Sequence, residues 1–141
     1  MITEIRDYFT KQIRAVDPDL RFDGYIFENE SIGTNNIDNT YKLVIGQTAS
    51  TRRDVINEAL TDVSVVIFKV SGTERVEGFD QLYCKAFKIL SKIASQTEIM
   101  QNDFIKSIIN RAIVPESIDS DDNSLRIRIE FQVITFFALE A

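Results

Sequence analysis

The segment Leu125-Arg126-Ile127-Arg128-Ile129-Glu130-Phe131-Gln132-Val133 decides the fold class, because apolar and polar side chains alternate along it without a break. This period of two is typical of a β-strand with one buried face and one polar face. From 134 to 137 both faces are apolar, so we expect a helix or another subunit to cover that end. A long strand over 125–137 is therefore predicted.

Further strands are predicted on the N-terminal side of this segment. Residues 41–47 alternate apolar and polar side chains, whereas 62–70 is dense in β-branched residues on both faces, as expected of a central strand. The short aromatic segment 24–28 predicts a weak strand. The polar segment 29–40 is predicted to be a long loop, and 48–61 a loop that can include a short helix.

Three helices are predicted from apolar residues that recur at helical spacing. The first covers 2–16 and ends at Asp17-Pro18, because the residue before proline avoids the α region. The second runs from about 75 to 96, and the third begins after a cap at Asn102 or Asp103. The apolar stripe of the second helix is Val76, Phe79, Tyr83, Phe87, Leu90 and Ile93, and that of the third is Phe104, Ile105, Ile108, Ile109 and Ala112, followed by Pro115.

Taken in order, these elements predict a single domain over residues 1–141 with an α+β fold, in which helices pack on one face of a mainly antiparallel sheet of about four strands. The length is near the modal size of one domain. The apolar fraction of 44% and the charged fraction of 27% are those of an ordinary globular protein. One hydrophobic core is therefore expected.

The composition argues against an enzyme and against a bound cofactor or metal. Histidine is absent and Cys84 is the single cysteine, so neither a histidine-activated nucleophile nor a zinc site can be assembled. The five glycines form neither of the common phosphate-binding loops. The net charge of −6 opposes non-specific binding to nucleic acid or anionic lipid. With one cysteine, no secretory leader and no membrane-length apolar run, the chain is expected to mature in a reducing cytoplasm.

An acidic segment, 116–123, precedes the last predicted strand. Asp119, Asp121 and Asn123, with Glu130 eleven positions after Asp119, reproduce ligand positions of a calcium-binding loop. The position that requires glycine holds serine, however, and Glu130 lies in a predicted strand. A solvated acidic turn is the favoured interpretation, and the sequence leaves a cation site open.

The most basic short patch is Ser50-Thr51-Arg52-Arg53-Asp54. Guanidinium groups pair with carboxylates through two parallel hydrogen bonds. Arg52 and Arg53 are therefore candidates for docking onto an acidic partner surface, with Thr51 and Asp54 beside them. The alternative is a solvated turn without a partner.

The order of elements resembles that of the tail terminator proteins of long-tailed bacteriophages, the family that includes the lambda tail terminator. The residues that carry the resemblance are Met1-Ile2-Thr3-Glu4-Ile5 in the first helix, the strand Tyr41-Lys42-Leu43-Val44-Ile45-Gly46, the insert Ser50-Thr51-Arg52-Arg53, the strand Val63-Ser64-Val65-Val66-Ile67-Phe68, a long helix and the final strand 125–137. The resemblance covers most of the chain and contains no invariant short motif.

The resemblance implies a structural virion protein that forms a ring, expected to be a hexamer, on the end of the tail tube. Such a ring stops further addition of tube protein, offers its other face to the head-side connector and catalyses no reaction. Its partners are then other copies of itself, the tail tube protein and the connector protein, while genomic DNA passes through the lumen without specific binding. The protein is expected in the tail or neck of the virion, after assembly in the host cytoplasm.

Contacts with the tube are expected in the polar loops 29–40 and 47–61, because these hold few core-forming residues. The candidate interface residues are Asn35 and Asn36 in the first loop, and Thr51, Arg52, Arg53 and Asp54 in the second. Two other functions stay open. One is a head-completion or other neck connector protein, and the other is a small enzyme or ligand-binding domain that uses carboxylates.

Overall fold

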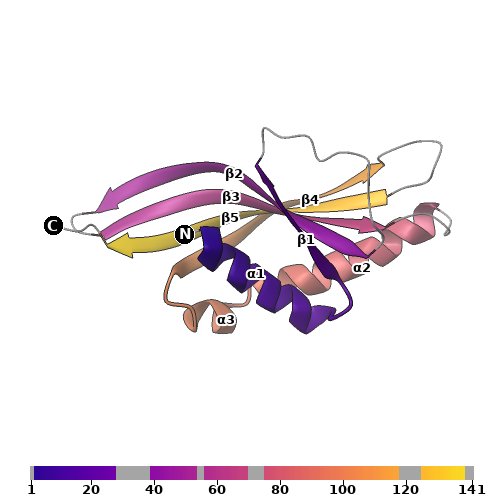
Figure 1. Cartoon of the computed structure of the whole chain (residues 1–141), viewed down its shortest axis with the longest axis horizontal. Coiled ribbons are helices and arrows are strands. Elements are labelled where there is room, and N and C mark those ends of the chain that lie inside the picture. Colours follow the sequence, from indigo (N-terminus) through magenta and orange to yellow (C-terminus); the bar gives the residue numbers. More distant parts are fainter. Residues whose placement is uncertain (1, 28–38, 54–55, 70–74, 118–124, 139–141) are drawn as a thin grey trace.

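The computed structural model describes residues 2–27, 39–53, 56–69, 75–117 and 125–138. Within these ranges the chain has the α+β fold that the sequence predicts (Figure 1). The elements in chain order are α1 (Ile2–Val16), β1 (Arg21–Phe27), β2 (Thr40–Arg53), β3 (Ile56–Lys69), α2 (Arg75–Ile93), α3 (Gln96–Met100), β4 (Ile105–Ser117) and β5 (Leu125–Ala138). None of the helices in the described ranges is long and apolar enough to cross a membrane.

The described strands form one sheet in the order β1-β2-β3-β5-β4. β1 runs parallel to β2 and all other neighbouring pairs are antiparallel, so the sheet is mixed and has five strands where about four were predicted. β3 is the central strand, which confirms the prediction from its β-branched composition. The three helices lie on one side of the sheet in Figure 1.

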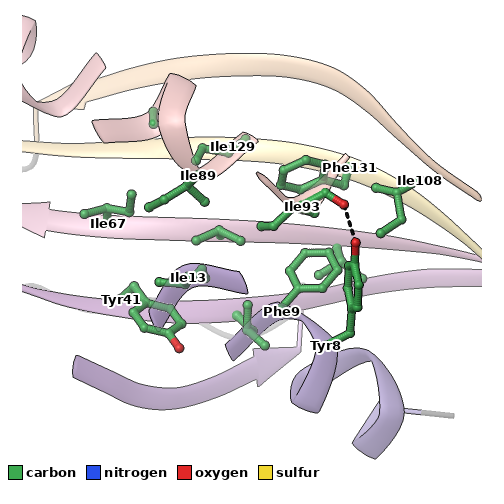
Figure 2. Close-up of a cluster of buried hydrophobic side chains, with 14 of the residues drawn as sticks. Tyr8, Phe9, Ile13, Tyr41, Ile67, Ile89, Ile93, Ile108, Ile129 and Phe131 are labelled. Carbon is green, nitrogen blue, oxygen red and sulfur yellow. Dashed lines mark hydrogen bonds between the residues drawn. The ribbon is translucent and has the colours of Figure 1, made fainter. Parts of the chain in front are cut away.

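The main core lies between the helices and one face of the sheet. The ring of Phe9 on α1 meets the ring of Phe131 on β5 edge-on, with 5.5 Å between the ring centres (Figure 2). Both side chains are at most 1% exposed. Ile89 of α2 is also fully buried in the same cluster, so this cluster joins two helices to the sheet.

Tyr8 connects α1 to the end of α2. Its hydroxyl donates a hydrogen bond of 2.6 Å to the backbone carbonyl of Ile93, the last residue of α2 (Figure 2). The last carbonyls of a helix have no partner within the helix, so the hydroxyl supplies one. Burial, together with the nearby negative charge of Glu98, raises the pKa of Tyr8 to about 12. The hydroxyl therefore stays protonated and remains a donor at neutral pH.

α1 and β1 are close to their predicted positions. α1 covers the predicted range, and β1 begins at Arg21, earlier than predicted. Gly24 has φ of +98°, which favours glycine, and it lies where the pairing of β1 with β2 shifts between Phe22 and Tyr25. Of the predicted polar loop 29–40, only the last two residues are described, and the second of them begins β2.

Residues 48–61 belong to a long antiparallel hairpin, so the prediction of a loop with a short helix is wrong. β2 pairs with β3 as far as Arg53 opposite Ile56. β3 pairs with β5 over the same stretch, with Ala59 opposite Thr135. A run of small and polar residues has little strand preference by itself. Pairing with a neighbouring strand determines its conformation, because β-propensity depends on context.

The predicted third helix is also wrong, because its residues form strand β4 and the short helix α3 precedes them. The pairing of β4 with β5 shifts at two bulges. β4 has one extra residue at each of them, Lys106 at the first and Arg111 at the second. The buried residues Ile105 and Ile108 are therefore three positions apart rather than two. This spacing imitates the periodicity of a helix.

β4 is an edge strand, which explains two further differences from the predicted helix. Phe104, just before β4, and Ile109 were expected to be buried but are 49% and 51% exposed. Pro115 was expected to end this region but pairs opposite Ile127 within the strand. Proline has no N–H to donate, and an edge strand tolerates it because one side has no neighbouring strand.

α2 is confirmed near its predicted limits, but its buried face matches the predicted stripe only in part. Ile93 of that stripe is buried, and Phe79, Tyr83 and Leu90 are partly buried and pack against the core. Val76 and Phe87 are 66% and 56% exposed. The buried apolar residues of α2 are Leu82, Ala86, Ile89 and Ile93. Gly78 allows the helix to approach β5 closely, since a Cβ there would lie 2.6 Å from Cδ1 of Leu125. The absence of a side chain at Gly78 therefore helps this face of α2 to meet the sheet.

Candidate functional site

The C-terminal ends of β2 and β5 and the N-terminal end of β3 lie beyond the helices (Figure 1). A bulge in β2 places Gly46 and Gln47 opposite Asp62, and pairing resumes at Thr48 opposite Thr61. The two threonine hydroxyl oxygens lie 3.2 Å apart, which joins the strands across this irregularity. The hairpin thereby continues as a regular ladder to its turn.

The outer side of this hairpin is a strand edge with no described strand beside it. β1 pairs with β2 only as far as Phe27 opposite Ile45. From Gly46 to Arg53, β2 has no strand on that side among the described residues. A free edge offers a row of backbone donors and acceptors that can pair with another chain.

Three of the predicted interface residues lie together beside the hairpin turn. Thr51, Arg52 and Arg53 are the last residues of β2 and pair with Glu58, Asn57 and Ile56 of β3. The structure thus places them on a strand and not in a loop. The other three predicted residues, Asp54, Asn35 and Asn36, lie outside the described residues.

A charged and aromatic cluster lies at this end of the hairpin, around Glu58. The Lys106 ammonium lies 2.8 Å from Oε1 of Glu58 and 5.6 Å from the centre of the Phe136 ring. The backbone N–H of Phe136 donates to the carbonyl of Phe104 at 2.8 Å. Lys106 and Glu58 are 48 positions apart, and Lys106 lies at a bulge, so no local sequence signal marks this cluster.

The acidic segment 116–123 is described only as far as Ser117. Glu116 forms ion pairs with Arg126 and with Arg128, the latter at 3.5 Å. Glu130 lies within β5, opposite Ala112 of β4. Among the described residues, no group of three or more His, Cys, Asp or Glu side chains could hold a metal ion. The proposed calcium ligands Asp119, Asp121 and Asn123 lie outside them.

No family model and no curated protein matches this chain. Among solved structures, it is similar to a chain of the "Virion of native gene transfer agent (GTA) particle". The TM-score is 0.49 and the sequence identity 9%, over 92% of each chain. At this level of similarity the match carries no argument about function.

Replacing Lys106 with methionine is expected to lower the free energy of unfolding by about 1–3 kcal/mol. The reason is that the Glu58 side chain, only 11% exposed, would lose this charged partner. Adding Glu58→Gln should recover part of the loss, which urea denaturation at pH 7 and a double-mutant cycle would measure. Lys88 of α2, which is exposed and has no ion pair within the described residues, provides the control Lys88→Met. An equal loss in the control would contradict the prediction.

Proposed function

We propose that this protein is a structural virion protein of the tail terminator kind. It forms a ring on the end of the tail tube, ends tube polymerisation and presents its other face to the head-side connector. The proposed partners are other copies of the chain, the tail tube protein and the connector protein, and no chemical step is involved. Its proposed place is the tail or neck of the virion, after assembly in the host cytoplasm.

The observation that carries this proposal is the hairpin of β2 and β3. Its outer edge from Gly46 to Arg53 has no strand beside it within the described chain, and Arg52 and Arg53 lie next to the turn. Such an edge can pair with a strand of the terminal tube subunit, and the two arginines can bind its carboxylates. Capping requires a surface that holds the last tube subunit and blocks the next, and this combination can supply one.

The charge of the chain supports the remaining part of the proposal. Ring formation around a lumen would bring many copies close to the passing DNA. The net charge of −6 on each copy disfavours adhesion of the phosphate backbone to the ring. We therefore propose that genomic DNA passes through the lumen without specific binding.

Tail length in electron micrographs tests the function directly. Deletion of the gene from the virus that carries it is expected to produce abnormally long tails without heads. Arg52→Glu with Arg53→Glu should give the same tails. The matched control, Lys88→Glu with Arg111→Glu, makes an equal charge change at one exposed position of α2 and one of β4, and it should leave tail length normal. Tails of normal length that lack heads after the deletion would instead indicate a head-completion protein.

A further inference from the structure

A basic pocket lies between α1 and β1, and neither the sequence motifs nor the proposed hairpin contact accounts for it. Its volume is about 450 Å³. Arg6, Thr10 and Arg14 line one wall, because residues four positions apart share a face of a helix. The remaining lining residues are Pro18, Leu20, Arg21, Phe22 and Tyr41. Three of these eight residues are thus arginines, and none is acidic.

Two of the arginines in this α1–β1 pocket have no partner in the part of the chain that the structure describes. Within the described residues, the side chains of Arg14 and Arg21 make no hydrogen bond or ion pair, whereas Arg6 pairs with Asp7 at 3.0 Å. Most other described cations are paired, for example Lys85 with Asp17 at 2.9 Å. Guanidinium groups that line one pocket repel each other, and a bound carboxylate would offset that repulsion.

Two aromatic residues, Phe22 and Tyr41, are part of the lining of the pocket. The rings of Phe22 and Tyr41 lie 5.4 Å apart, and Phe22 is 38% exposed. Arginine, tyrosine and phenylalanine are the residues enriched at the centres of protein interfaces. The pocket therefore has the composition of a protein-binding site, with the positive charge that an acidic partner requires.

The same helix has an acidic flank on the side that faces α3. A pocket of about 250 Å³ there is lined by Glu4, Asp7 and Glu98, with Lys11 as the one cation in the lining. Asp7 and Glu98 also pair with Arg6 and Lys92, which lie outside this lining. This α1–α3 flank and the α1–β1 pocket are different surfaces of one chain with opposite charge. Contact between two such surfaces on successive copies is head-to-tail, and contacts of this kind generate rings or filaments.

We propose that the α1–β1 pocket binds the acidic α1–α3 flank of a second copy of this chain, and that this contact joins neighbouring subunits. The inference rests on the proposed ring and adds its subunit interface. Arg14 and Arg21 would form charge-assisted hydrogen bonds with the carboxylates of the neighbour's flank, while Phe22 excludes water from them. The hairpin remains available for the tube.

Sedimentation velocity of two variants and their mixture tests this contact. The pocket variant carries Arg14→Glu and Arg21→Glu, and the flank variant carries Glu4→Lys and Asp7→Lys. Each variant alone is expected to self-associate about 100-fold more weakly than the wild type. An equimolar mixture should associate again, because the acidic pocket of one variant meets the basic flank of the other. Lys88→Glu, an exposed site on α2, should associate like the wild type.

A mixture that fails to associate, or a wild-type protein that shows no self-association at its highest attainable concentration, would overturn this interface. The milder pair Arg14→Gln and Arg21→Gln serves if the glutamates disturb folding, which circular dichroism would show. Tail length after gene deletion tests the capping function independently of this interface. Long tails after deletion, together with normal tails from the pocket variant, would reject the interface and leave the capping function supported.

Discussion

Replacing Phe131 with alanine is expected to lower the free energy of unfolding by about 3–5 kcal/mol. Phe131 is 1% exposed and lies in β5, on the face of the sheet that forms the main core. Its ring meets that of Phe9 edge-on, so the substitution removes an aromatic pair and leaves a cavity between α1 and the sheet (Figure 2). Urea denaturation followed by circular dichroism would measure the loss.

Gln132→Ala is the matched control for this substitution. Gln132 is the next residue of β5 and is half-buried on the other face of the sheet. Its replacement should change the free energy of unfolding by less than about 1 kcal/mol, as most substitutions away from the core do. A loss for Phe131→Ala no larger than that of the control would contradict the arrangement of the core.

Ile108→Asp is expected to unfold the protein or to destabilise it by about 4 kcal/mol or more, because it places a carboxylate in the core without a partner. Ile108 is 5% exposed. Its neighbour Ile109 is 51% exposed on the edge strand β4, so Ile109→Asp should cost less than about 1 kcal/mol. Thermal melting and urea denaturation of the two variants would measure the difference.

These two substitutions distinguish the observed strand from the helix that the sequence predicts. A helix over these residues would bury both isoleucines, and both substitutions would then be severe. In β4 the two side chains lie on opposite faces, so one substitution is severe and the other is mild. Equal destabilisation by the two variants would argue against β4.

Elements with a strong and uninterrupted period were predictable from the sequence. The alternation in 125–137 identified β5, and the apolar spacing of 2–16 identified α1. In both, each turn or pleat repeats the same pattern, so local sequence and tertiary packing favour the same conformation. The β-branched composition of 62–70 likewise identified the central strand β3.

Elements with bulges or with small residues were not predictable in the same way. The extra residues Lys106 and Arg111 changed the period of β4 from two to three, which resembled a helix. In α2, the large side chains of Val76 and Phe87 suggested a buried stripe, but both are exposed. Gly78 permits close approach to β5 and Ala86 is fully buried, but small residues such as these add little to an apolar periodicity.

The candidate site was predicted in part. The basic patch was recognised from the sequence, but its position beside the turn of a hairpin depends on pairing with β3 and β5. Lys106 and Glu58 are brought together across 48 positions, and no local pattern could indicate this pair. The α1–β1 pocket draws Arg14 and Tyr41 from elements far apart in the sequence, so only the packing of α1 against the sheet forms it.

The alternation from Leu125 onwards by itself determined a strand with one buried face, because burial of every second side chain is a local property of the chain. It determined neither which strands pair with this one nor which elements cover each face of the sheet. The tertiary structure decided that β3 and β4 lie on either side of β5, that Phe9 of α1 covers Phe131, and that the hairpin extends beyond the helices. Those outcomes depend on contacts between distant residues, which no single stretch of sequence contains.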